Sequence, residues 1–580
     1  MYRTKSLAEF SEKDVGSTVQ VSGWVANIRD HGGVSFVDLR DMYDVMQVVM
    51  GETNKQTSLL KGIVKETCVS ITGVIEKRDE DTINPKIKLG TIELRAQKVE
   101  ILGKVRKMLP FEISSSKDIR EDKRLEYRYL DLRNEKVKEN ILFRSQVISY
   151  IREQMNGLGF TEIQTPILCA SSPEGARDYV VPSRVHKGKF YALPQAPQQY
   201  KQLLMVSGID KYYQIAPCFR DEDARADRSP GEFYQLDFEM SFATQEDVFE
   251  VGQKVLSNVF KKFAPEGYSV DDEFPVITYK EAMLKYGTDK PDLRNPLEII
   301  DVTDFFHRCT FKPFTKCTVR AIKCHAEMSK SFHKKLEEFA LSIGMGGLGY
   351  LYVNDDLSYY GPIDKFIPED MKIQFRELAG LEAGDTIFFI GDKESRAAQF
   401  AGQIRTELAQ RLGIIDDKSY RFCFINDFPM YEYDEQEKKI SFTHNPFSMP
   451  QGGLEALETK NPLDILAYQF DIVCNGVELS SGAVRNHDID IMKKAFSIAG
   501  YDEEVLKEKF GALYNAFQYG APPHAGMAPG IDRMLMLLRN EENIREVIAF
   551  PMDGKAQDLM CGAPSELTEH QLREVHIKLR

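Results

Sequence analysis

Hydrophobic and polar residues alternate along the first part of the chain. Short runs with this period of two lie between Thr18 and Leu102, separated by turns that contain Gly or Asn, as in TVQVSGWVANI, VMQVVM and CVSITGVIEKR. Such alternation predicts β-strands with one buried face. Five strands of this kind predict an OB-fold β-barrel over residues 1–104, a fold that binds single strands by stacking bases on exposed aromatics. A purely structural barrel is the alternative.

The periodicity changes after residue 104. Residues 105–136 are highly charged and poorly periodic, which predicts a hinge. A helix is expected next, because apolar residues then recur along one stripe, at Ile141, Ile148, Ile151 and Met155. Gly157 and Gly159 end this pattern before an extended run.

Strand-like and helical runs then alternate in two blocks. Residues 137–288 and residues 418–580 predict the two halves of one α+β domain. Residues 289–417, between them, carry a helix and strand pairs of their own and begin near Pro291 and Pro296. We therefore expect a separate α/β insertion domain within a multidomain α+β protein.

Composition narrows the class of protein. The chain has 580 residues, well beyond the roughly 100–200 residues of one domain. No apolar run reaches the roughly 18 residues of a membrane span, and the charged N-terminus has no secretory h-region. The nine cysteines include no C-x-x-C pair, which favours reduced thiols. We therefore expect a cytoplasmic protein without a membrane partner.

The net charge bears on nucleic-acid partners. A formal charge of −14 argues against sequence-independent binding of nucleic acid, DNA included, because phosphate contacts need clustered cations. It leaves selective RNA recognition open, since basic side chains can gather on one face of an otherwise acidic protein.

A dense cluster of charges marks the first candidate site. Phe219-Arg220-Asp221-Glu222-Asp223 is followed by Arg225, Arg228 and the run EFYQLDFE, which predicts two strands joined by a charged loop. An arginine at a strand end matches phosphate oxygens, and an aromatic on the opposing strand can stack on a purine. Nucleotide binding competes here with a solvated hairpin whose charges neutralise one another.

Two further clusters lie nearer the C-terminus. Gly526 and Gly530 precede Arg533 in an otherwise apolar helix, where the guanidinium needs either a phosphate or an intrachain carboxylate. Asp471 and Glu478 flank an Asn-Gly turn, so a hairpin can bring their oxygens together as Mg²⁺ ligands. Solvated carboxylates are the alternative for this pair.

With Gly159-Phe160-Thr161-Glu162-Ile163-Gln164-Thr165-Pro166, these clusters resemble motifs 1, 2 and 3 of class II aminoacyl-tRNA synthetases, in order. The resemblance covers essentially the whole chain. It is most specific over the stretches SSPEGARDYVVPSRVHKGKFYALPQAPQQYKQLLM and FRDEDARADRSPGEFYQLDFEMSF, which resemble bacterial-type aspartyl-tRNA synthetases. The family's fold is an OB-fold anticodon domain, an antiparallel-sheet catalytic domain and an α/β insertion.

The resemblance implies that L-aspartate reacts with ATP to give aspartyl-adenylate, and that aspartate then passes to the 3′ end of tRNA(Asp). Arg220 and Arg533 would be catalytic, on the α- and γ-phosphates, and Asp471 and Glu478 would hold Mg²⁺. The implied ATP site comprises Arg220, Asp221, Glu222, Arg228, Phe233, Gln235, Glu478, Gly530, Ile531, Asp532 and Arg533.

The resemblance also implies a set of aspartate-binding residues, namely Glu174, Gln198, Lys201, Arg220, Asp237, His444 and Arg485. Lys201 and Arg485 would bind the side-chain carboxylate, and Asp237 would orient both cations. Two buried cations should reject neutral asparagine, because an unpaired buried charge costs several kcal/mol. Ala196 and Asn445 depart from the family's usual residues without breaking the pattern.

In the barrel, the implied anticodon contacts are Arg29, His31, Phe36, Gln47, Asp81 and Glu93. A core phenylalanine is the alternative for Phe36. The loop containing His31 resembles that of non-discriminating enzymes, which also charge tRNA(Asn), whereas Asp81 fits neither subclass. The motif 1 resemblance implies a homodimer. The competing functions are another class II ligase of the same subgroup, asparaginyl or lysyl, and a non-catalytic tRNA-binding paralogue.

Overall fold

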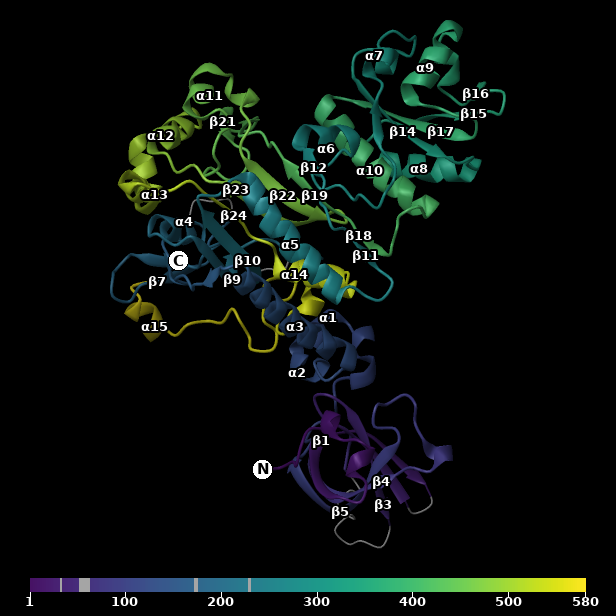
Figure 1. Ribbon diagram of the computed structural model, residues 1–580, viewed down its shortest axis with the longest axis vertical. Helices are drawn as coiled ribbons and strands as arrows, with labels where there is room; N and C mark the ends of the chain where they lie inside the picture. Colours follow the sequence, from purple (N-terminus) through teal and green to yellow (C-terminus); the bar gives the residue numbers. More distant parts are fainter. Residues whose placement is uncertain (32–33, 52–62, 172–175, 228–230, 580) are drawn as a thin grey trace. The chain divides into compact units, whose positions relative to one another are not determined.

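The computed structural model describes residues 1–579 except 32–33, 52–62, 172–175 and 228–230 (Figure 1). The chain divides into two compact units, Met1–Glu112 and Ile113–Arg580. Among the described residues, no helix is both long and apolar enough to cross a membrane.

The first unit is a closed five-stranded barrel with the strand order β1-β2-β3-β5-β4. Its strands are β1 Thr18–His31, β2 Val34–Arg40, β3 Val45–Gly51, β4 Cys68–Lys77 and β5 Ile92–Gly103. Neighbours pair antiparallel except β3 and β5. In β2, Val37 and Leu39 are buried in the barrel core, so Phe36 and Asp38 belong to the outer face. The OB-fold barrel predicted from alternation is confirmed.

The second unit is built on an eight-stranded sheet with the order β12-β19-β22-β23-β24-β10-β9-β6. The strands are β6 Thr161–Glu162, β9 Lys211–Arg220, β10 Gly231–Ser241, β12 Val276–Thr278, β19 Phe422–Asn426, β22 Gln469–Cys474, β23 Val477–Val484 and β24 His524–Met527. The six central strands are antiparallel, as predicted. Both edge pairs are parallel, which makes the sheet mixed. Parallel pairing needs a long crossover, and the insertion supplies one between β12 and β19.

Three helices pack on this sheet and share one core with it (Figure 1): α3 Glu135–Gly157, α5 Gln245–Phe263 and α14 Ile531–Arg539. α3 is the helix expected from the apolar stripe. Ile151 and Met155 are fully buried, and Asn134 caps the first turn by accepting a hydrogen bond from the backbone of Lys136. The predicted hinge also contains helices, α1 Glu121–Glu126 and α2 Arg128–Asp131.

The remaining elements of the catalytic part surround the central sheet. Short strands pair as β7 with β8, β11 with β18 and β20 with β21, and their bounds are Val180–Pro182, Phe190–Ala192, Ser269–Val270, Ser419–Tyr420, Tyr431–Asp434 and Lys439–Phe442. The helices are α4 Gln198–Val206, α6 Tyr279–Lys285, α11 Gly453–Thr459, α12 Ile489–Ile498, α13 Glu503–Ala516 and α15 Glu569–Glu574.

The insertion has its own five-stranded antiparallel sheet with the order β13-β14-β17-β15-β16. Its strands are β13 Ile299–Asp301, β14 Thr318–His325, β15 Gly349–Val353, β16 Tyr359–Tyr360 and β17 Asp385–Asp392. Both faces are covered: Ile387 and Phe389 pack with α7 Thr303–Phe306 and α9 Lys372–Ala379, whereas Phe388 and Ile390 pack with α8 Lys330–Ser342 and α10 Glu394–Leu412. This explains why β17 is hydrophobic at successive positions.

Candidate functional site

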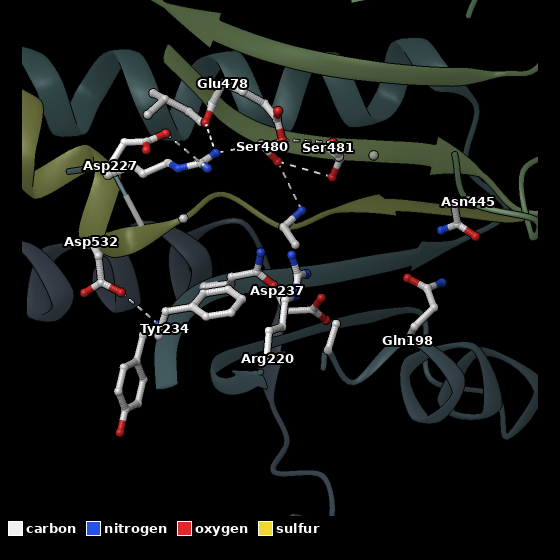
Figure 2. Close-up of a pocket in the computed structure, with 18 of the residues that line it drawn as sticks. Gln198, Arg220, Asp227, Tyr234, Asp237, Asn445, Glu478, Ser480, Ser481 and Asp532 are labelled. Carbon is white, nitrogen blue, oxygen red and sulfur yellow. Dashed lines mark hydrogen bonds and ion pairs between the residues drawn. The ribbon is translucent and has the colours of Figure 1, made fainter. Parts of the chain in front are cut away.

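A cavity of about 350 Å³ opens over the central strands of the eight-stranded sheet. The site residues predicted from the sequence that line it are Gln198, Lys201, Arg220, Glu222, Phe233, Gln235, Asp237, Glu478, Arg485, Gly530, Asp532 and Arg533. Figure 2 shows Glu478, Ser480 and Ser481 on one side, with Arg220, Asp237 and Gln198 opposite. Residues from α4, β9, β10, β23 and α14 therefore meet around one space.

Other predicted residues lie elsewhere. The side chain of Ile531 is fully buried in the main core, and Asp221 pairs through its backbone with Arg177. His444 is exposed and packs edge-on against Phe428, with 5.1 Å between ring centroids. Glu174 and Arg228 lie outside the described residues, so their roles stay predictions.

Two cations and two carboxylates lie together at the floor of the cavity, which Lys201, Asp237 and Arg485 line, and none of the four side chains is more than 3% exposed. The ammonium of Lys201 lies 2.8 Å from Oδ2 of Asp237 and 3.4 Å from Oε2 of Glu239. Arg485 donates from Nε and Nη2 to the two oxygens of Glu239, at 2.8 and 3.1 Å. We call these four residues the buried quartet.

The quartet corrects one expectation about Asp237. The sequence predicted that Asp237 orients both cations, but in the structure Asp237 accepts a hydrogen bond from Lys201, whereas Glu239 accepts both side-chain hydrogen bonds of Arg485. Glu239 was missed, although β10 carries a signal for it: residues two apart in a strand face the same side, so Glu239 follows Asp237 into the floor.

The pKa values of the two carboxylates in the quartet are shifted in opposite directions. Burial raises the pKa of Asp237 even though Lys201 opposes this. Burial would also raise the pKa of Glu239, but Arg485 and Lys201 outweigh it and lower that pKa. Within the quartet, Glu239 is therefore a stronger acid than an ordinary glutamate, and Asp237 is a weaker acid than an ordinary aspartate.

Strands β9 and β10 present the predicted nucleotide site. Arg220 pairs with Gly231 at the end of the hairpin, and Phe233 pairs with Cys218. The guanidinium of Arg220 lies over the ring of Phe233, 4.9 Å from its centroid. A cation at a strand end beside an aromatic ring provides contacts for both phosphate and base.

The predicted hairpin of Asp471 and Glu478 is present as β22 and β23. Its turn residues Asn475 and Gly476 both have positive φ, 52° and 81°. A bulge after Ile472 shifts the register by one residue, so that Asp471 pairs with Ser481 rather than with Ser480, while Glu478 pairs with Val473.

The two carboxylates nevertheless interact. The hydroxyl of Ser481 donates to Oδ1 of Asp471 at 2.6 Å and lies 3.5 Å from Oε1 of Glu478. Burial, followed by the charge of Glu478, raises the pKa of Asp471 well above its usual value. Burial acts on Glu478 as well, but Lys290, 2.8 Å away, outweighs it and lowers the pKa of that group. Buried oxygen ligands of this kind suit a divalent cation.

Arg533 lies in the first turn of α14, beside this pair. Its Nη1 donates to the carbonyl of Glu478 at 2.7 Å, while the carboxylates of Glu478 and Asp227 lie 3.9 Å away. These long ion pairs leave room for an anionic ligand. Next to it, Asp532 accepts from the backbone of Tyr234 at 3.0 Å and pairs with Arg144, which fixes α14 to β10 and α3.

In the barrel, three of the six predicted anticodon residues form one hydrogen-bond network. Arg29 donates to Asp38 at 2.8 Å and to Gln47 at 3.2 Å, and Gln47 donates to Glu93 at 2.8 Å. Phe36 pairs with Arg29 across β1 and β2 and is half-buried.

The two remaining predicted anticodon residues lie at a strand end and in a turn. His31 is the last residue of β1, and Asp81 is exposed in a short 3₁₀ turn, Glu80–Thr82. Their contacts with RNA stay predictions.

Each of the two units matches a known protein family. Residues 120–554 match the family described as tRNA synthetases class II (D, K and N), and residues 19–102 match the OB-fold nucleic acid binding domain. The chain belongs to the class II tRNA synthetases of the D, K and N group. The predicted family and the predicted enzyme class, an aminoacyl-tRNA ligase, are thereby confirmed.

Full-length relatives of this synthetase are named as aspartate–tRNA ligases. It is 53% identical to an aspartate–tRNA(Asp/Asn) ligase of Ehrlichia chaffeensis over 100% of this chain and 99% of that protein. It is 56% identical to one of Erythrobacter litoralis, over 100% and 96%. A Streptomyces avermitilis relative named aspartate–tRNA ligase is 52% identical over 100% and 99%.

Solved structures confirm the fold of the synthetase. An asparaginyl-tRNA synthetase from Pyrococcus horikoshii complexed with asparaginyl-adenylate matches with a TM-score of 0.60 at 17% identity, covering 95% of this chain and 98% of that one. A putative aspartyl-tRNA synthetase from Leishmania major also gives 0.60, at 20% identity, covering 95% and 94%.

Proposed function

We propose that this synthetase activates L-aspartate with ATP and transfers aspartate to the 3′ end of tRNA(Asp). The observation that carries the proposal is the buried quartet. Lys201 and Arg485 are held by carboxylates at the floor of a cavity whose walls carry Arg220 and Arg533. One cavity thus offers cations for an amino-acid carboxylate and for phosphates.

In the first step, an α-carboxylate oxygen of aspartate bonds to the α-phosphorus of ATP, and the bond to the bridging β-phosphate oxygen breaks. Pyrophosphate leaves with that electron pair. Arg220 holds the α-phosphate and the attacking carboxylate, while Arg533 binds the γ-phosphate, so that in-line geometry and charge neutralisation lower the barrier. Phe233 stacks on adenine.

Asp471 and Glu478 supply hard oxygen ligands for Mg²⁺, and the raised pKa of Asp471 marks a buried carboxylate that gains from a nearby cation. When bound, Mg²⁺ neutralises phosphate charge. In the second step, a hydroxyl of the terminal tRNA ribose attacks the aspartyl carbonyl, and AMP leaves.

Selectivity for aspartate follows from the charge of the floor. Asparagine has the same shape but brings no negative charge to Lys201 and Arg485, so it forgoes the charge-assisted hydrogen bonds that the side-chain carboxylate of aspartate would accept from these cations. The same argument disfavours lysine, whose ammonium would meet like charges. These points weigh against the asparaginyl and lysyl alternatives.

We also propose that the barrel reads the anticodon and that tRNA(Asn) is a second substrate. Relatives named for both tRNAs support this, as does the resemblance of the loop that contains His31 to non-discriminating enzymes. The motif 1 resemblance supports a homodimer. Aminoacylation of purified tRNA(Asp) and tRNA(Asn) tests the tRNA proposal: comparable rates are expected, and a rate gap of about a thousandfold contradicts it.

Pyrophosphate exchange tests the amino acid. Labelled pyrophosphate should enter ATP when aspartate is present and fail to do so with asparagine or lysine. Exchange that depends on either of those two amino acids, and not on aspartate, contradicts the proposal.

A further inference from the structure

The first residues of the insertion reach the active-site cavity. Lys290 lies between α6 and β13 and lines the cavity together with Glu478 and Arg533. Its ammonium is 2.8 Å from Oε2 of Glu478, and its side chain is 41% exposed. The sequence analysis placed this residue at the start of the insertion and gave it no role.

Helix α10 of the insertion holds the segment that carries Lys290. Arg405, which is 1% exposed, donates to the backbone carbonyls of Leu297, Asp292 and Asn295 at 2.6, 3.0 and 2.8 Å. Its guanidinium also lies over the ring of Tyr286, 5.0 Å from the centroid. A buried arginine bound to three carbonyls fixes the path of this chain segment.

A close backbone approach fixes the other end of the segment. A methyl group built on Gly402 of α10 would lie 2.7 Å from the carbonyl oxygen of Gly287, and one on Gly287 would lie 2.2 Å from the carbonyl oxygen of Ala398. Only glycine fits at either position, and Gly287 also has a φ of +69°. The insertion thus determines where Lys290 is placed.

The segment also packs on the turn that carries Glu478. A methyl group built on Gly476 would contact Cβ of Asp292 at 3.4 Å. Lys290 and Arg533 then approach different oxygens of the Glu478 carboxylate, at 2.8 and 3.9 Å. A polyphosphate bound by Arg533 would pass within reach of a second, partly exposed cation.

We propose that Lys290 is a catalytic residue, supplied by the insertion, whose ammonium moves from Glu478 to the β- and γ-phosphates of ATP and to the departing pyrophosphate. A lysine suits this task because its ammonium is a compact point charge on a flexible stem. The inference rests on the proposed function, which supplies the polyphosphate. It gives the insertion a part in aspartate activation.

The test compares Lys290→Ala and Lys290→Arg with the wild type and with Lys285→Ala. Lys285 is a matched control, since it pairs with Glu281 on α6 and does not line the cavity. Aspartate-dependent pyrophosphate exchange gives KM for ATP, pyrophosphate and aspartate over a range of Mg²⁺ concentrations. Calorimetric titration of the aspartate-free enzyme with ATP measures binding without turnover.

For Lys290→Ala we expect kcat/KM for ATP to fall about tenfold or more, with a raised KM for pyrophosphate, weaker ATP binding and an unchanged KM for aspartate. Lys290→Arg should recover part of the loss, and Lys285→Ala should match the wild type. If Lys290 only neutralises Glu478, its removal lowers the Mg²⁺ requirement and leaves KM for pyrophosphate unchanged, which overturns the inference. A wild type without aspartate-dependent exchange overturns the proposed function instead.

Discussion

At the scale of single residues, the buried quartet shows how charge can persist in a core. Each isolated charge would cost several kcal/mol to bury, so Lys201, Arg485, Asp237 and Glu239 remain only as partners. The ion pairs between them, at 2.8 Å, offset the free-energy cost of burying the four charges. The same ion pairs hold Lys201 and Arg485 in place before a substrate carboxylate binds. Selectivity for aspartate therefore depends on the packing of these four residues.

His524 lies under this quartet and allows a prediction about pH. Nδ1 donates to the carbonyl of Pro522 at 2.8 Å, and Nε2 faces the side-chain amide of Gln202 at 3.2 Å. Burial lowers the pKa of His524 to about 4, although Glu239 opposes this. The unfolded chain therefore binds a proton at a higher pH than the folded protein does.

Stability should then fall as pH drops from about 6.5 to about 4, by about 3 kcal/mol for this one group. Urea unfolding of the wild type and of His524→Gln at several pH values checks this. The difference between the two curves isolates His524 from Asp237, whose raised pKa acts in the opposite direction. A difference that does not vary between these pH values contradicts the prediction.

At the scale of elements, an ion-pair network joins the predicted hinge to the end of the catalytic domain. Asp131 of α2, with no exposed side-chain surface, accepts from Arg124 at 3.0 Å and from Arg128 at 2.5 Å. Arg124 also binds Glu546 at 2.7 Å, in the 3₁₀ turn Ile544–Val547. The sequence predicted a hinge from charge and weak periodicity, whereas these charges are buried against one another.

Asp131→Asn should destabilise the second unit by about 3–5 kcal/mol, because it leaves two buried guanidinium groups short of a carboxylate. The measurement is the midpoint of the urea transition followed through loss of ATP-pyrophosphate exchange. Asp122→Asn is the control in α1, since Asp122 pairs with Arg120 in solvent, and its midpoint should match the wild type. Equal midpoints for the two variants would show that the network contributes nothing.

Hairpin β22–β23 shows what sequence predicts at this scale and what it leaves out. The Asn-Gly turn and the spacing of Asp471 and Glu478 were sufficient to predict two strands with neighbouring carboxylates. The bulge after Ile472 was not predictable, because it depends on how the hairpin joins the rest of the sheet. The hydroxyl of Ser481 now lies between carboxylates that do not face one another directly.

At the scale of the whole molecule, the contacts that the sequence did not predict are those between residues far apart along the chain. Local patterns predicted the barrel, an interrupted α+β domain and the charged clusters, and the family resemblance implied twelve of the 25 described residues that line the cavity. Glu239 and Lys290 were missed because their partners, Arg485 and Glu478, come from strands far along the chain. Strand alternation indicates that Glu239 faces the same side as Asp237, but local periodicity does not encode which distant residue pairs with Glu239 or with Lys290.

The two compact units are predicted to have separate functions, tRNA recognition in the first and aspartate activation in the second. The predicted anticodon residues belong to the barrel, and every residue of the cavity belongs to the second unit. Phe36→Ala removes an outer-face ring whose stacking on a base is worth about 1–3 kcal/mol, so KM for tRNA should rise about 5- to 150-fold.

Aspartate-dependent pyrophosphate exchange by Phe36→Ala, measured without tRNA, should stay at the wild-type rate, because the cavity proposed to bind its substrates is lined by residues of the second unit. The control is Tyr43→Ala, which removes an exposed barrel aromatic that is not among the predicted anticodon residues and should leave KM for tRNA unchanged. Aminoacylation at varied tRNA concentration supplies these constants. If Phe36→Ala slows exchange while KM for tRNA stays constant, then Phe36 acts on the fold or on the catalytic unit, and the barrel's outer face is not the RNA-binding surface.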